Sequence, residues 1–288
     1  MTGRRLRPGR VALHAFLAGT SLLWIAPVAW TFYTSLRPYG DTAEHGYFSL
    51  ARGVSLINYR RAWTEGDLPR HFVNTMVITA PAVLLTLILA AFVAFAVTQY
   101  RIPFGRTVLL VFTAGNLLPQ QVIVTPLYWM YLHIPLPPGL SDSGLLYDSY
   151  LGVIAIHVAF QTGFCAFVMS NYMRTLPGEL VEAAVMDGAS VWRQFWQVVL
   201  PICRPALGAL ATLEFIWVYN DFFWALVLMQ SGDRRPVTSA LADLHGVYFV
   251  DNNLVAAGAL LVALPTLIVY FALQRQFLSG LTLGATRS

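Results

Sequence analysis

Two carboxylates stand in a stretch of the sequence that otherwise carries no charge. Between residues 205 and 232 the only acidic or basic side chains are Glu214 and Asp221. On a continuous helix, positions 214, 217, 221 and 224 share one face, which would bring Trp217 and Trp224 beside the two acids. Carboxylates accept hydrogen bonds from hydroxyl groups, and an indole ring offers a flat apolar wall. This combination suits the binding of a sugar.

A structural role is the alternative for the same residues. The functional interpretation rests on the rule that charged side chains in a membrane span face the bundle interior and often mark a pathway. Asn and Asp also join neighbouring helices by hydrogen bonds, which could be the role of Asn220 and Asp221. His157, a lone imidazole, is expected to pack between helices, because no partner spacing for a metal site or a proton relay accompanies it.

The two acids are poorly spaced for catalysis. Seven residues on one helix separate them by roughly 10 Å, which is wide for a pair that shares one proton. Neither H-E-x-x-H nor G-x-S-x-G occurs in the chain. The sequence also has no Lys, so it cannot contain a Walker A phosphate loop. An intramembrane enzyme is therefore a remote alternative, and any ATP-driven step requires a separate ATPase subunit.

A second segment is polar and helix-prone, and it separates two long apolar runs. Pro177 suits the first turn of a helix. Gly188 falls where the residue after a helix adopts positive φ, and Ser190 can cap a second helix. That second helix is predicted to run to Val199 and to stop before Pro201. The pattern predicts a helix, a tight turn and a second helix within residues 175–203.

The first of these two helices is expected to have distinct faces. Residues at i, i+4, i+7 and i+8 form one apolar stripe: Leu176, Leu180, Ala183 and Ala184. Glu179, Glu182 and Met186 lie on another face, and the small side chains of Ala183 and Ala184 allow close approach of another surface. An amphipathic linker resting on the membrane is the alternative on spacing alone.

Six apolar runs are long enough to cross a membrane, because a spanning helix needs roughly 20 mostly apolar residues. The chain has 288 residues, of which 57% are hydrophobic and 11% charged. The predicted fold is therefore all-α: a polytopic membrane protein, one transmembrane domain over residues 1–288. The spans are expected at about 12–36, 72–98, 107–131, 150–172, 205–230 and 254–273.

Basic residues indicate the orientation of these spans. With the N-terminus inside, the cytoplasmic side holds 11 of the 18 Arg residues against three acids. Both termini, and the segment 175–203 between spans four and five, are then cytoplasmic. The net charge of +4 reports this topology and does not indicate nucleic-acid binding.

The residues also resemble a known family. "EAAVMDGA" followed by "VVLP" resembles the EAA loop of the membrane subunits of ABC importers, with matches at Glu182, Ala183, Ala184, Gly188, Leu200 and Pro201. "NDFFWALV" at 220–227, "GLTLGA" at 280–285 and "LLPQQVIVTPLY" at 117–128 resemble the maltose-type permeases, the carbohydrate branch. These matches are spread over roughly the last 190 residues of the chain.

The resemblance implies a transport subunit without catalysis of its own. Its EAA loop would be a coupling helix, with Glu182, Ala183, Ala184, Asp187 and Gly188 meeting an ATPase subunit. Asn220 and Asp221 match the family and would pack or gate, whereas Glu214 departs from it and is a candidate contact with the solute.

Several partners are implied by the same resemblance. They are a second related permease, two ATPases that bind ATP and Mg²⁺, and an extracytoplasmic solute-binding protein, all at a bacterial plasma membrane. The solute would be a mono-, di- or oligosaccharide. The alternative is a non-sugar such as a glycerol-phosphate ester.

Overall fold

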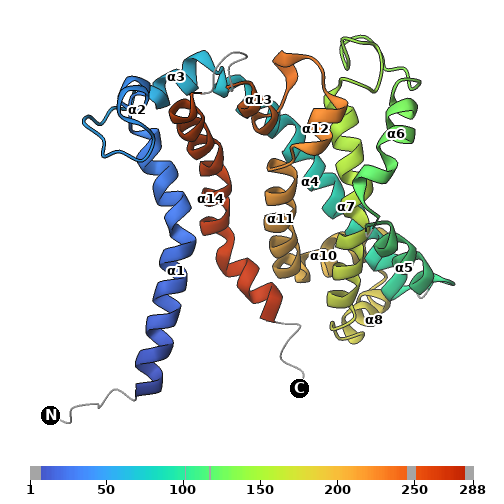
Figure 1. Cartoon of the computed structure of the whole chain (residues 1–288). Coiled ribbons are helices and arrows are strands. Elements are labelled where there is room, and N and C mark those ends of the chain that lie inside the picture. The colour runs from blue at the N-terminus through green and yellow to red at the C-terminus, as the bar shows by residue number, and fades with distance from the viewer. Residues whose placement is uncertain (1–7, 101, 117, 245–250, 283–288) are drawn as a thin grey trace. The chain divides into compact units, whose positions relative to one another are not determined.

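Helices make up the regular structure of the chain. The computed structural model describes residues 8–100, 102–116, 118–244 and 251–282 (Figure 1). No β-strand occurs in these ranges, apart from isolated bridges such as Pro135 with Leu145. The all-α prediction is confirmed. The chain divides into two compact units: one takes α1 to α3 and the start of α14, and the other takes α4 to α12 and the end of α14.

Within the described residues, four helices are each long and apolar enough to cross a membrane. They are α1 (Pro8–Ser35), α4 (Leu68–Gln99), α7 (Tyr150–Met173) and α14 (Asn252–Thr282). They correspond to the predicted spans one, two, four and six. At 1.5 Å per residue, even the 24 residues of α7 reach about 36 Å, which exceeds a hydrocarbon core of roughly 30 Å.

The predicted span three is a pair of helices instead of one. α5 (Gly105–Asn116) and α6 (Gln120–Tyr131) meet at an angle of 95°. Pro119 directly precedes α6 and has no N–H to donate to a preceding turn. The break between the two helices therefore lies at a proline.

The predicted span five, 205–230, is also divided. α11 (Arg204–Tyr219) is followed by Asn220 as its C-cap, and α12 (Phe223–Leu228) starts three residues after this cap. The Asp221 carboxylate accepts hydrogen bonds from the backbone N–H groups of Trp224, at 3.4 Å, and Ala225, at 3.2 Å. Asp side chains favour such caps over helix interiors. A continuous helix through positions 214 to 224 was therefore a wrong prediction, and so was their common face.

The segment between α1 and α4, for which no helix was predicted, contains two helices. They are α2 (Tyr39–His45) and α3 (Ile57–Glu65). Buried Asn58 donates to the carbonyls of Ser35 and Arg37, and buried Asn253 donates to the carbonyls of Thr34 and Arg37. The end of α1 is thus tied to both α3 and α14 by side-chain amides.

One buried carboxylate holds the loop before α7 against the end of α12. Asp148 accepts hydrogen bonds from the N–H groups of Gln230, at 2.8 Å, and Ser231, at 3.0 Å, and from the Ser231 hydroxyl. Burial alone would raise the pKa of this carboxyl, but the hydrogen bonds from Ser231 and Gln230 hold the pKa below its usual value. The ionised form is therefore the one that the fold stabilises.

Removing this carboxylate is expected to destabilise the protein. Asp148→Ala leaves three donors without an acceptor, at a cost of about 1–3 kcal/mol. It also places alanine at a φ of 57°, which Asp and Asn tolerate better. Asp148→Asn, which keeps one acceptor and that backbone conformation, should lose less. Thermal unfolding in detergent at pH 7 measures both, and equal losses would contradict this account.

The same contact gives a pH dependence. Because the folded-state pKa lies below the unfolded value of about 3.9, the contribution of Asp148 is complete above that value. It is lost as the pH falls through the folded pKa. The stability difference between the wild type and Asp148→Ala should therefore shrink below about pH 4.

Candidate functional site

The EAA segment forms a short helix that ends in a tight glycine turn. α8 (Glu179–Met186) is preceded by Pro177, whose carbonyl accepts from the N–H of Leu180 at 3.3 Å. At its end, Gly188 has a φ of 74° and donates to the carbonyl of Val185, while Ala189 donates to the carbonyl of Ala184. This pair of hydrogen bonds is the Schellman motif. The predicted positive φ at Gly188 is confirmed.

Gly188 is required for its backbone conformation and not for lack of space. A Cβ built on Gly188 meets no atom within 4 Å. An L-residue in the left-handed region costs roughly 1–2 kcal/mol, so a side chain here strains the turn even though it fits.

Only a narrow side of α8 packs against the rest of the protein. Ala184 is buried, and Val181 packs against the adjoining core cluster with Leu176. Ala183 is exposed, and Met186 is 87% exposed. The predicted stripe of Leu176, Leu180, Ala183 and Ala184 is therefore wrong in part. The short connection from α7 turns the helix so that Val181 takes the inner position and Leu180 and Ala183 face outward.

A groove of about 900 Å³ runs along α8. Its walls come from the ends of α4 and α7 and from α8 itself, including Gln99, Arg174, Glu182 and Met186. Glu182 and Asp187 are both exposed. The segment thus presents apolar and acidic side chains side by side on an open surface.

The second helix of the segment begins as predicted and ends later. Ser190 caps α9 (Val191–Arg193) by accepting from the N–H of Arg193 at 3.4 Å. The chain continues as a π-helix, η1 (Gln194–Val199), and then as α10 (Leu200–Ile202). The predicted stop before Pro201 is therefore wrong. The N–H of Leu200 donates five residues back to Phe195, and this wider turn accommodates the proline ring without a standard helical hydrogen bond.

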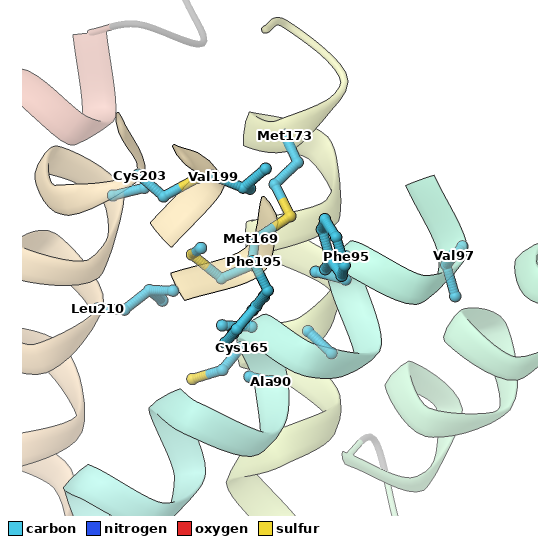
Figure 2. Packing of buried hydrophobic residues seen from close by; sticks show 14 of the residues in the cluster. Ala90, Phe95, Val97, Cys165, Met169, Met173, Phe195, Val199, Cys203 and Leu210 are labelled. Atoms are coloured by element: carbon cyan, nitrogen blue, oxygen red, sulfur yellow. The ribbon is translucent and has the colours of Figure 1, made fainter. Parts of the chain in front are cut away.

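This second helix is embedded in the main core cluster. Figure 2 shows Phe195 and Val199 among side chains of α4 and α7. Cys203, which precedes α11 (Arg204–Tyr219), and Leu210 of α11 lie in the same cluster. Cys203 is fully buried and free, and so is Cys165 on α7, and both pack as small apolar residues. The segment is therefore continuous with the membrane-spanning core.

Aromatic rings of α4 and of the second helix pack directly against one another. Phe92 of α4 stacks on Phe195 with ring centroids 4.2 Å apart, and it also contacts Trp192 and Trp196. Phe95 contacts Phe195 edge-on at 5.3 Å. Through these rings η1 contacts α4 directly.

Hydrogen bonds join the turn to the same helix. The Tyr100 hydroxyl, just beyond α4, lies 3.0 Å from Oε1 of Gln194, and Nε2 of Gln194 donates to the carbonyl of Ala189 at 2.7 Å. Ala189 directly follows Gly188. Sequence reasoning missed Tyr100 and Gln194, since nothing in their spacing links them.

The candidate residues of span five are not gathered on one surface. Glu214 and Trp224 are buried, whereas Trp217 is 42% exposed and Asn220 is exposed. Asn220, at the end of α11, donates to the carbonyl of Ile216 at 2.8 Å and to the Thr266 hydroxyl at 3.3 Å. Trp217 and Asn220 are accordingly the two that a solute could reach in this conformation.

Asp221 lies between these groups and faces α7. Its Oδ2 is 3.7 Å from Nε2 of His157, which is 4% exposed. Helix α7 also contacts α11 and α12 (Figure 1). Because His157 lies close to Asp221, it packs where the break of span five meets α7. A helix-packing position for His157 was predicted, and its nearness to Asp221 was not.

Glu214 is enclosed by α7 and α11. The Cys165 thiol donates to Oε1 of Glu214 at 3.1 Å, and Oε2 has no hydrogen-bond partner among the described residues. Because the side chain is fully buried, we expect Glu214→Gln to change the uptake KM by less than about twofold. A larger change in KM with an unchanged expression level would return Glu214 to the solute path.

Comparisons with known proteins show that the sequence is similar to membrane components of transport systems. A family described as the binding-protein-dependent transport system inner membrane component matches residues 72–278. The diacetylchitobiose uptake system permease protein NgcG of Streptomyces coelicolor is 30% identical over 276 residues, 95% of this chain and 88% of that protein. The melibiose/raffinose/stachyose import permease protein MelC of Bacillus subtilis is 29% identical over 88% of each chain.

The fold has a counterpart of known structure. A chain in the crystal structure of a bacterial ABC transporter involved in the import of the acidic polysaccharide alginate matches with a TM-score of 0.79. The match covers 96% of this chain and 99% of that one, at 22% sequence identity.

Proposed function

The chain belongs to the inner membrane components of binding-protein-dependent transport systems, and on this premise we propose that it forms half of the membrane path for a sugar in an ATP-driven importer. It is a permease subunit of an ABC importer, a multi-pass protein of the inner membrane. The proposal of a sugar is supported by relatives named for diacetylchitobiose and for melibiose, raffinose and stachyose.

The coupling surface is proposed to be the outer side of α8. The observation that carries this proposal is that Ala184 is the only buried residue of α8, so the opposite side of the helix is exposed. The turn at Gly188 ends the helix and fixes its position. Exposed Ala183 would allow close approach of an ATPase subunit, and Glu182 and Asp187 would pair with its basic or hydrogen-bond donor groups. An amphipathic linker lying in the membrane is less well supported, because two acids share the exposed surface.

Force would pass from this surface into the bundle through η1. A short helix that is rigidly joined to a packed core transmits a rigid-body displacement to that core. The stack of Phe195 on Phe92 supplies the contact with α4, and the hydrogen bonds of Gln194 fix the turn to the same helix.

The remaining partners follow from the premise. Two ATPase subunits would bind ATP and Mg²⁺, because the chain has no Lys for a Walker A loop. A second related permease would complete the path, and a solute-binding protein would deliver the solute from outside. From the distribution of Arg, both termini would be cytoplasmic. Residues 1–7 and 283–288 lie outside the described residues, and so does part of the "GLTLGA" motif.

The solute path is proposed to include Trp217 and Asn220. An exposed indole and an exposed amide suit the apolar faces and the hydroxyls of a sugar. Asp221, which caps α12, would act as a gate or a packing element, and buried Trp224 and Glu214 would not contact the solute in this conformation.

Uptake measured in a deletion strain tests the solute. We expect loss of uptake of one labelled mono-, di- or oligosaccharide, restored when the gene is returned. A panel of sugars should be run beside a labelled glycerol-phosphate ester. If uptake of the ester alone depends on the chain, the sugar proposal is wrong and the alternative solute replaces it.

A further inference from the structure

A loop beside the end of α1 displays large apolar side chains that are mostly exposed. In residues 47–56, Phe48 is 89% exposed, Leu50 87%, Val54 74% and Leu56 68%. A run of this size exposed on one loop marks an interaction surface. Arg52, in the middle of the loop, is exposed as well.

The loop is firmly built despite this exposure. Arg37 is 1% exposed, and its guanidinium donates to the carbonyls of Tyr47 and Ser49, both at 3.0 Å, and to the Ser49 hydroxyl at 2.9 Å. The same side chain pairs with Asp41 at 2.8 Å. The buried arginine therefore fixes the backbone of the loop, so the apolar side chains are presented without a further ordering cost.

Two aromatic residues of α1 set the position of the loop. The Tyr33 hydroxyl donates to the carbonyl of Ser49 at 3.1 Å and accepts from the N–H of Ala51 at 2.6 Å. Phe48 stacks on Trp30 with ring centroids 5.5 Å apart. Phe48 and Leu50 are thus held at the same level along α1 as Trp30 and Tyr33.

That level corresponds to a membrane interface. The 28 residues of α1 measure about 42 Å, roughly 12 Å more than a hydrocarbon core, so about one turn emerges at each end. Trp30 and Tyr33 lie within the last six residues of the helix, where Trp and Tyr favour the headgroup level. The most apolar part of α1 contributes no buried residue, so the exposed apolar surface continues from the helix into the loop.

We propose that residues 47–56 are an interfacial anchor, whose Phe48 and Leu50 side chains insert into the boundary between lipid headgroups and acyl chains at the C-terminal end of α1. Apolar side chains enter this zone to a depth of roughly 5–10 Å, and a neighbouring cation such as Arg52 can meet lipid phosphate. With the N-terminus inside, this is the outer leaflet. The proposal depends on α1 crossing the membrane and not on the solute or the ATPase.

Spin labels measure the depth directly. Phe48→Cys and Leu50→Cys are labelled in the full-length chain with its co-purified partners, in nanodiscs of phosphatidylethanolamine and phosphatidylglycerol. Glu44→Cys on exposed α2 is the aqueous reference, Trp24→Cys on α1 is the reference within the span, and the unsubstituted protein gives the background from the two buried cysteines. Collisions with oxygen and with a water-soluble nickel chelate are compared at each site.

We expect the ratio of oxygen to nickel collisions at positions 48 and 50 to exceed that at position 44 at least about fivefold, at a depth between the two references. A ratio equal to that at position 44 would place the loop in water. Low collision rates with both reagents would show that protein covers it. Either result overturns the anchor, and neither depends on transport activity.

Discussion

Gly188→Leu is expected to lower uptake at least about tenfold while ATP hydrolysis continues and the chain still inserts into the membrane. The backbone at this position has a φ of 74°, which costs an L-residue roughly 1–2 kcal/mol. Leucine should therefore open the turn and release the hydrogen bond from Ala189 to Ala184. α8 would then no longer move with η1. Uptake and ATPase rates measured in the same proteoliposomes give the coupling ratio.

Gly188→Asn is the matched control. Asn tolerates the left-handed region far better than Leu, and a Cβ at this position meets no atom of the described residues within 4 Å. Asn should keep most of the uptake if backbone conformation is what matters. Equal loss of uptake in both variants would mean that the partner subunit requires the absence of any side chain at position 188, and that backbone conformation is not the cause.

Phe195→Ala is expected to destabilise the protein and to weaken coupling together. Phe195 is 1% exposed and stacks on Phe92, and emptying such a site costs about 3–5 kcal/mol. The cavity would separate η1 from α4, so uptake should fall more than ATP hydrolysis. Thermal unfolding in detergent and the coupling ratio in proteoliposomes measure the two effects.

Phe215→Ala is the comparison for this variant. Phe215 stacks on Tyr219 of its own helix, at 5.5 Å, and is half-buried. We expect a smaller loss of stability and an unchanged coupling ratio. A double-mutant cycle of Phe92 and Phe195 should give an interaction of about 0.5–1.5 kcal/mol. Additive effects, or an equal fall in coupling for Phe215→Ala, would contradict a role for the stack in coupling.

The helical elements and the glycine turn could be predicted because local physics determines them. Apolar runs of spanning length gave α1, α4, α7 and α14. Gly188 and Ser190 were predictable because positive φ and helix caps select for particular residue types.

The remaining features depend on contacts between distant residues. Asp221 breaks span five by capping α12, and an Asp in an apolar run does not reveal by itself whether it will cap or face a partner. The π-helix that precedes Pro201 packs against Phe92, about a hundred residues earlier in the sequence. The hydrogen bonds of Arg37 likewise depend on where Tyr47 and Ser49 return to α1.

Cross-linking at position 186 tests the central claim most directly. Met186 is 87% exposed on α8, so Met186→Cys should form a cross-link to an ATPase subunit in membranes of cells that express the whole transporter. Glu44→Cys, beyond the C-terminal end of α1, is the topological control and should react with a membrane-impermeant thiol reagent added to intact cells. The account predicts the ATPase cross-link at position 186 and no reaction there from outside. Labelling of position 186 from outside, without an ATPase cross-link, would contradict it.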